Sequence, residues 1–451
     1  MKNDLTQGNV LEKLIKFSLP YLFSCFLQTF YGLADLFITG QFNGADAITA
    51  VSVGSQVTHM LTVVIVGLAM GTTVNIGLAV GADNERKVSK VIGNTISLFA
   101  IFSVLLTLIL LAANNKILYA LSVPEESWIQ AKNYLTVCFI GVPFITAYNV
   151  LSSIYRGMGD SRSPLYFIGI AGVFNIVFDY LLIGVFRLGA LGAALATVAA
   201  QALSVAAALS ALLMQQKKNR AFSVKMDDLR LSVPDVKGLL KVGAPIALQD
   251  GLIQVAFLII TVIANRRGLE AAAAVGIVEK LIGFMFLVPS AMLSAVSAVT
   301  AQNAGAGFHD RGKKALGCGI LITVVTGMVF TISCQFFAET LIGFFVKDEP
   351  AVILMGGQYL RAYVPDCIFA GIHFCFSGYF CAYQKSMISF AHNLAAIILV
   401  RIPGAYYASK LFPDSLYPMG LAAPLGSVLS AVICVIFYIM LRKEFVKKVS
   451  N

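Results

Sequence analysis

Long apolar segments constrain this chain more than any other feature, because each is long enough to cross a lipid bilayer as a helix. The 451 residues contain twelve of them. They lie at roughly 14–40, 46–72, 90–113, 130–154, 164–185, 190–214, 239–264, 271–301, 315–338, 352–380, 387–409 and 420–441. Each reaches the ~20 residues that a helix needs to cross a hydrocarbon layer of ~30 Å. The runs are unbroken rather than alternating, so they exclude a membrane β-barrel and predict an all-α polytopic membrane protein.

The charge distribution indicates how the chain is oriented in a membrane. Only 12% of the residues are charged, and the net charge is +10. If both termini are cytoplasmic, most of the 33 Lys and Arg residues fall in the inner loops and tails, as the positive-inside rule requires. The positive charge therefore indicates topology and no nucleic-acid partner. The polar start, MKNDLTQGN, indicates no cleavable signal peptide, and a bacterial plasma membrane is the expected location.

Enzymatic and cofactor chemistry find no support in the sequence. The eight cysteines lie in apolar stretches without CxxC spacing, and the four histidines are scattered. No Gly-rich phosphate loop follows a strand, which argues against ATP-driven chemistry within this chain. We therefore predict that the protein is not an enzyme and holds no cofactor.

The chain repeats itself at an offset of about 224–225 residues. Its one long polar segment between spans, at 215–241, separates six spans from six. Pro20 in "LEKLIKFSLPYLF" corresponds to Pro245 in "DVKGLLKVGAPIAL", and "GADNERKVSKVIG" at 81–93 corresponds to "GAGFHDRGKKALGCG" at 305–319. Six spans per half give both halves the same orientation, related by an axis along the membrane normal. This predicts two pseudo-symmetric six-helix lobes, 1–214 and 239–451, joined by a cytoplasmic linker at 215–238.

Three stretches resemble the multidrug and toxic compound extrusion (MATE) transporters, and with the repeat the resemblance covers the whole chain. They are "YGLADLFITG" at 31–40, "YRGMGDSRSPLYFIGIAGVFNIVFDYLLIGVFRLGALGAALATVAAQ" at 155–201 and "AQNAGAG" at 301–307. The resemblance implies a secondary active antiporter that exports amphipathic, mostly cationic small molecules in exchange for Na⁺ or H⁺. It also implies alternating access between the lobes, with the lipid bilayer as its other partner.

The resemblance also implies where the coupling ion binds. Asp35, Asn175, Asp179 and Thr197 match positions that form a cation or proton site in the N-lobe of relatives. Some relatives have further acidic residues in the C-lobe. Here the corresponding places, near Ile253, Gln254 and Ala370, are not acidic, and Asp250 and Asp366 lie about one turn away. We therefore expect coupling to concentrate in the N-lobe.

Helix geometry supports the N-lobe group independently of the resemblance. At 1.5 Å per residue, Asp35, Asp179 and Thr197 lie roughly 8, 9 and 10 Å from the outer ends of their helices. Asn175 precedes Asp179 by one turn, so the two share a helix face. An ionised Asp near the centre of a membrane helix costs about 2.5–3.5 kcal/mol on insertion scales. Desolvation and like charge favour a proton on one carboxyl group, or a Na⁺ ion held by the same oxygens. Neutralisation would then let the first helix bend at Pro20 or Gly32.

A second set of residues lies beside this group or at membrane depth in other helices. We expect Tyr31 and Asn149 to border the N-lobe group. Asp250, Glu279, Lys280 and Asp366 either face the substrate cavity or pair with other helices, and the same alternatives hold for His373 and Arg401.

A lipid-linked saccharide flippase of the same superfamily is the alternative function. It would need several basic residues in its cavity for a pyrophosphate, whereas only Lys280 and Arg401 lie at membrane depth here. We expect the transporter to act as a monomer.

Overall fold

The computed structural model describes residues 5–218, 224–346 and 349–447, and within these ranges every regular element is helical. The first half contains α1 (Val10–Phe42), α2 (Ala45–Gly81), α3 (Glu85–Ala120), α4 (Glu125–Ile140), α5 (Val142–Gly157), α6 (Arg162–Asp179), the π-helical turn η1 (Tyr180–Val185), α7 (Gly189–Lys218) and the 3₁₀ turn η2 (Met226–Leu229). The second half contains α8 (Val233–Asn265), α9 (Leu269–Met285), α10 (Leu287–Gly305), α11 (His309–Gly343), α12 (Pro350–Tyr363), α13 (Asp366–Ala382), α14 (Ser386–Ala396), the π-helical turn η3 (Ile397–Arg401), α15 (Ile402–Leu411), α16 (Tyr417–Gly420) and α17 (Ala422–Lys447).

The described helices confirm the all-α polytopic class. Where consecutive helices are joined into one span, as α9 with α10 and α12 with α13, eleven described helical segments are long and apolar enough to cross a membrane. The count is twelve if α4 and α5 form one bent span. The bend between them is 47° and lies at Gly141. A Cβ atom at Gly141 would lie 2.4 Å from a methyl group of Val198 on α7, so a glycine is needed for this close packing.

By their packing, the helices form two compact units. The first unit is Leu19–Gly243, and the second combines the described residues between Asp4 and Ser18 with those from Ala244 on. The boundaries therefore fall inside α1 and α8, just before Pro20 and Pro245. Each proline removes one backbone hydrogen bond within its helix, which makes these positions natural points of bending. The division into lobes at 1–214 and 239–451 with a cytoplasmic linker stays a prediction, and residues 219–223 of that linker lie outside the described residues.

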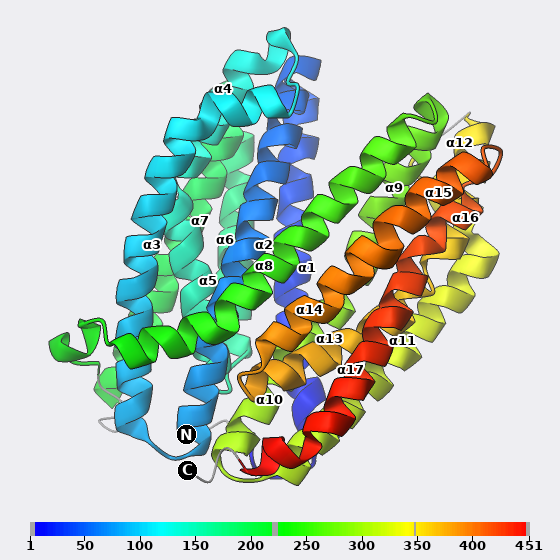
Figure 1. Ribbon diagram of the computed structural model, residues 1–451. Coiled ribbons are helices and arrows are strands. Elements are labelled where there is room, and N and C mark those ends of the chain that lie inside the picture. The colour runs from blue at the N-terminus through cyan, green and yellow to red at the C-terminus, as the bar shows by residue number, and fades with distance from the viewer. Residues whose placement is uncertain (1–4, 219–223, 347–348, 448–451) are drawn as a thin grey trace. The chain divides into compact units, whose positions relative to one another are not determined.

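In the first unit, α2, α3, α5 and α7 lie side by side, and α6 packs along α7 (Figure 1). Asn84 caps the N-terminus of α3, since its side chain accepts a hydrogen bond from the Lys87 backbone N–H. The η2 turn is attached to α3 by the buried Asp228, whose carboxylate lies 2.7 Å from Arg86. The second half of the predicted linker thus packs on the first unit as an ordered segment.

Two glycines let α2 and the start of α8 touch through their backbones within the first unit. A Cβ atom at Gly71 would lie 2.1 Å from the Leu239 carbonyl oxygen, and one at Gly243 would lie 2.1 Å from that of Leu68. Small residues at such crossings are typical of membrane helices, which gain stability from close packing rather than from the hydrophobic effect.

We expect Gly71→Ala and Gly243→Ala each to destabilise the protein by about 1–3 kcal/mol, because the added methyl group forces two backbones apart. The measurement is thermal unfolding of the purified protein in detergent. Gly317→Ala on α11 is the control, since a Cβ atom there meets nothing within 4 Å. Equal melting temperatures for Gly71→Ala and Gly317→Ala would contradict the backbone contact.

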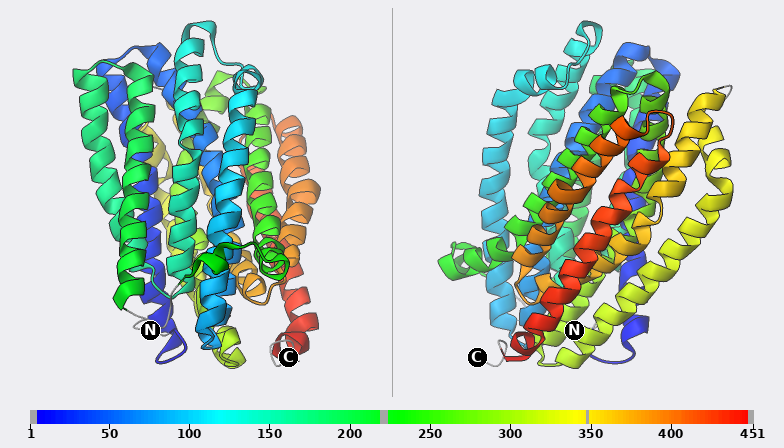
Figure 2. Two further views of the ribbon diagram at one scale, coloured as in Figure 1. Left: turned by 90° about the vertical axis from the view of Figure 1, so that its left-hand side faces the viewer. Right: turned by 45° about the vertical axis from the view of Figure 1, so that its right-hand side comes forward.

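In the second unit, α10 and α13 pack against each other, with α11 and α17 also lying against α13 (Figure 2). The "AQNAGAG" stretch at the end of α10 holds the N-terminal segment of the chain. Gln302 accepts a hydrogen bond from the Leu5 backbone N–H at 3.3 Å, and the Asn303 amide donates to the Leu5 carbonyl oxygen at 3.2 Å. This motif therefore holds Leu5 against α10.

Candidate functional site

Asp35 lies about two turns before the end of α1, with only 2% of its surface exposed. Its Oδ2 atom accepts a hydrogen bond of 3.0 Å from the Thr197 hydroxyl on α7. The Thr39 hydroxyl donates to the Asp35 carbonyl oxygen at 2.7 Å, one turn further along α1. The structure thus brings together two predicted site residues that are 162 positions apart in sequence.

Asn175 and Asp179 complete the group from α6. Both are fully buried, at 0% exposure, and both lie close to the Asp35 side chain. The two carboxyl groups lie close to each other, and no described hydrogen bond joins them. The π-helical turn η1 begins at Tyr180, immediately after Asp179. Such turns interrupt the regular hydrogen-bond ladder and occur frequently at functional sites.

Several polar atoms of this group have no hydrogen-bond partner in the described protein. Among the described residues, Asp35 Oδ1, both Asp179 carboxylate oxygens and both polar atoms of the Asn175 amide have no hydrogen-bond partner. Buried polar atoms are nearly always paired, so a concentration of unpaired ones marks a place for a bound species. Carboxylate, amide and hydroxyl oxygens suit a proton or a hard cation such as Na⁺. The described residues contain no group of three or more His, Cys, Asp or Glu side chains placed to hold a metal ion.

Of the two residues expected to border the group, the structure connects Tyr31 to a polar partner on α7. The Gln201 amide donates to the Tyr31 hydroxyl at 2.9 Å. Gln201 was not predicted, although it lies one turn after Thr197 and therefore on the same face of α7. Asn149 is buried, but its amide donates to the Ile145 carbonyl oxygen of its own helix. Asn149 is therefore not connected to Asp35 by a described hydrogen bond.

Tyr134 on α4 is a further neighbour that sequence reasoning missed. It is 2% exposed and lies near both Asp35 and Asp179. Its ring lies on Gly54 of α2, where a Cβ atom would come within 2.1 Å of it. No pattern in the sequence indicates this contact, because it depends on how α2 and α4 cross.

The remaining candidates belong to the second unit. Asp366 and Arg401 form a buried ion pair with an N–O distance of 2.6 Å. Glu279 accepts from the Thr261 hydroxyl at 3.2 Å, and Asp250 accepts from the Gln249 amide at 3.4 Å. Lys280 is exposed. For Asp366 and Arg401, the structure selects pairing between helices from the alternatives that the sequence left open.

Comparisons with known proteins show which family this chain belongs to. The MatE family model matches the chain twice, over residues 20–181 and 245–407, so the two matches lie in the two halves of the predicted repeat. The chain is 28% identical over 404 residues to the probable multidrug resistance protein YpnP of Bacillus subtilis, covering 89% of this chain and 88% of the relative. It is 26% identical over 447 residues to the FAD transporter of Shewanella oneidensis, covering 96% and 95%. It is 25% identical over 385 residues to the multidrug export protein MepA of Staphylococcus aureus, covering 82% and 81%.

Solved structures show the same fold. The crystal structure of MATE in complex with MaL6 superimposes with a TM-score of 0.91 at 21% identity, covering 99% of this chain and 100% of that one. A MATE transporter in an outward-facing conformation gives 0.90 at 20% identity, covering 99% of each chain. The family match spans well over half of the chain, in both halves of the repeat. The protein is therefore a multi-pass membrane protein that belongs to the MatE family of transporters.

Proposed function

We propose that this protein is a secondary active antiporter that exports amphipathic, mostly cationic small molecules in exchange for H⁺ or Na⁺. The observation that carries the proposal is the pair of buried carboxyl groups, Asp35 and Asp179, surrounded by unpaired polar atoms. Two of the relatives reported above, YpnP and MepA, have multidrug resistance or multidrug export in their names, which supports the substrate class. Intramembrane carboxyl groups typically mark ion or proton pathways.

The proposed cycle follows from the charge of this group. With both carboxyl groups ionised, their repulsion and desolvation destabilise the state in which they are close and buried. A proton or Na⁺ ion reduces the negative charge and stabilises that state. Because Asp35 is on α1, the change is transmitted to a helix that contains Pro20 and in which a Cβ atom at Gly32 would meet no described atom within 4 Å. Bending of α1 then biases the two units between inward-open and outward-open states, and substrate leaves on the return half of the cycle.

The flippase alternative receives no support from the basic residues. Arg401 is already paired with Asp366, and Lys280 is exposed. Cytoplasmic termini and a monomeric state stay predictions.

The test is efflux from proteoliposomes under an imposed pH or sodium gradient, with a fluorescent cation as substrate. We expect one of the two gradients to accelerate efflux and its collapse by the matching ionophore to remove the effect. Efflux that responds to neither gradient would count against the mechanism.

Thr197→Val should raise the half-saturating concentration of the coupling ion about tenfold. The substitution keeps the shape of the side chain and removes a hydrogen bond to a charged group, which contributes about 1.5–3 kcal/mol. Thr197→Ser keeps the hydroxyl and is the matched control. The measurement is the initial efflux rate against ion concentration in the same proteoliposomes, and equal curves for the Val and Ser variants would show that the hydroxyl has no part in coupling.

A further inference from the structure

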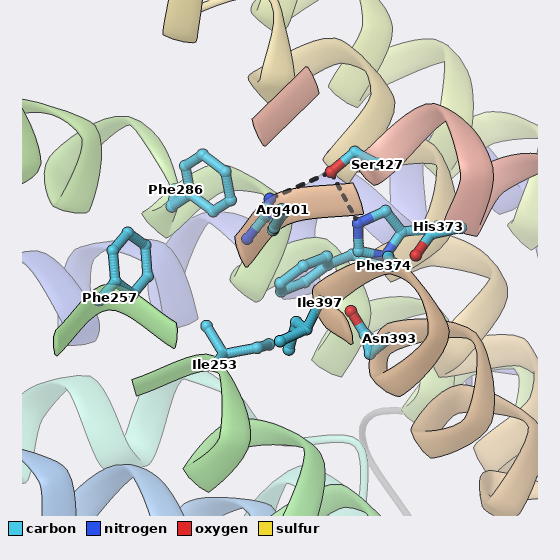
Figure 3. Close-up of a pocket in the computed structure, with 11 residues that line it drawn as sticks. Ile253, Phe257, Phe286, His373, Phe374, Asn393, Ile397, Arg401 and Ser427 are labelled. Carbon is cyan, nitrogen blue, oxygen red and sulfur yellow. Dashed lines mark hydrogen bonds between the residues drawn. The ribbon is translucent and has the colours of Figure 1, made fainter. Parts of the chain in front are cut away.

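The polar groups inside the second unit leave little room for a further partner. Arg401 and His373 both form hydrogen bonds with the Ser427 hydroxyl, and the cavity beside them has a volume of about 30 Å³ (Figure 3). A cavity of this size holds about one water molecule. The first unit, in contrast, presents an outward face that a larger partner fits, on the segment that contains η2 and the first turns of α8.

Residues 224–243 form this segment, which we call the linker segment, and one side of it is held on α3. The Asn94 amide donates to the Asp228 carbonyl oxygen at 3.2 Å, and the Ser97 hydroxyl donates to the Leu229 carbonyl oxygen at 2.6 Å. Figure 1 shows the segment projecting sideways past α3. It is therefore fixed to the first unit and lies at the surface of that unit.

Two of the three acidic side chains of the linker segment point toward α3. Asp228 and Asp235 are buried, and they pair with Arg86 and Lys87 of α3, respectively. The third acidic side chain, Asp227, is exposed. Ion pairing with α3 thus removes two negative charges from the outward face of the segment.

Large apolar side chains lie on this outward face. Met226 is 82% exposed and Val233 is 80% exposed, and Leu231 between them is exposed as well. In α8, Lys237 and Leu240 follow Val233 by four and seven residues, so these exposed side chains share one helix face. Apolar side chains that are exposed together mark an interaction surface.

The charges of the outward face are mainly positive. Lys225, Arg230 and Lys237 are exposed, and the exposed Asp227 lies 3.9 Å from Arg230. Basic side chains beside exposed apolar ones are typical of segments that lie on an anionic membrane surface.

The attachment to α3 places the linker segment at the edge of the hydrocarbon layer. Lys90 and Lys116 bracket the apolar part of α3, so its midpoint is at Ser103. The Asp228 carbonyl oxygen lies against Gly93, where a Cβ atom would come within 2.3 Å of it. Gly93 is ten residues from Ser103, roughly 15 Å along the helix. This is half of a hydrocarbon thickness of ~30 Å, so the linker segment lies where acyl chains meet headgroups.

We propose that the linker segment binds anionic phospholipids of the cytoplasmic leaflet. Lys225, Arg230 and Lys237 contact the headgroups, and Met226 and Val233 lie among the first carbons of the acyl chains. The leaflet follows from the predicted cytoplasmic position of the termini, and anionic lipids give that leaflet its negative surface potential. This interaction surface is separate from the Asp35 group and goes beyond the proposed export function.

The test measures tryptophan fluorescence of the full-length protein in lipid nanodiscs. Trp128 is the single native tryptophan, so Trp128→Phe/Val233→Trp reports on the linker segment alone. The discs contain phosphatidylglycerol and phosphatidylcholine in equal amounts, and one lipid or the other has quenching bromine atoms near the headgroup end of its chains. We expect quenching by brominated phosphatidylglycerol to be about fivefold stronger than by brominated phosphatidylcholine, the factor that one basic residue near an anionic surface provides.

Adding Arg230→Gln/Lys237→Gln should lower this ratio to about one, whereas Arg230→Lys/Lys237→Arg should keep it. Trp128→Phe/Leu105→Trp is the matched control, because Leu105 is an exposed residue near the midpoint of α3. Both lipids should quench it equally.

The inference is overturned if neither lipid quenches Trp128→Phe/Val233→Trp, or if both quench it equally. It is also overturned if the ratio survives in the Gln variant or appears equally in the Leu105→Trp control. None of these outcomes depends on ion-driven efflux, which the proteoliposome assay decides separately.

Discussion

Asp35→Asn is expected to reduce ion-driven export to the background rate while the protein remains folded in the membrane. Asparagine keeps the size of the side chain and an oxygen for the Thr197 hydroxyl, whose hydrogen bond to Asp35 is 3.0 Å long. It cannot gain or lose a proton and brings no charge to a cation. If neutralisation of this group drives the cycle, a permanently neutral residue removes the switch. The measurement is gradient-driven efflux in proteoliposomes, with the amount of inserted protein determined in parallel.

Asp46→Asn provides a matched control in the same unit. Asp46 is a partly buried aspartate in the first turn of α2, and it accepts a hydrogen bond of 2.5 Å from Gln130. It does not contact the Asp35 group through any described hydrogen bond. Export should therefore persist in this variant. Normal gradient-driven efflux by Asp35→Asn would contradict the proposed mechanism, whatever efflux rate Asp46→Asn shows.

Arg401→Ala is expected to destabilise the protein by about 3–5 kcal/mol, the range for removing one partner of a buried ion pair. Asp366 has 0% exposure, so the substitution leaves a carboxylate without countercharge in the interior of the second unit. It also removes the donor to Ser427 at 3.2 Å. Thermal unfolding in detergent measures the effect.

The double variant Asp366→Asn/Arg401→Gln shows whether the loss of stability comes from an unpaired charge or from lost packing of the Arg401 side chain. Replacing both partners of a buried pair is often nearly neutral, because no charge is left to desolvate. It should therefore melt well above Arg401→Ala. A double variant as unstable as the single one would show that the packing of Arg401 on Gly426, rather than its charge, holds this part of the second unit.

The sequence alone predicted that the residues of the N-lobe group lie at one level of the membrane. Helix rise and span ends place Asp35, Asp179 and Thr197 at one depth, and side chains at one depth on packed helices can meet. The 3.0 Å contact between Asp35 and Thr197 agrees with that placement. Depth gives no information about which face of a helix points inward. For that reason Tyr134 and Gln201 were missed, and Asn149 lacks the expected connection to the Asp35 group.

The sequence by itself determined that the chain is an all-α membrane protein built from a duplicated half, because bilayer thickness sets helix length and an offset of about 225 residues is visible without coordinates. It also singled out Asp35, since a carboxylate in an apolar helix is costly. Only the tertiary structure decided which polar groups pair. Arg401 is satisfied by Asp366, whereas Asp35 and Asp179 keep unpaired oxygens. The pairing of buried polar groups depends on helix rotation and crossing at the scale of a few ångströms, which no hydrophobic pattern specifies.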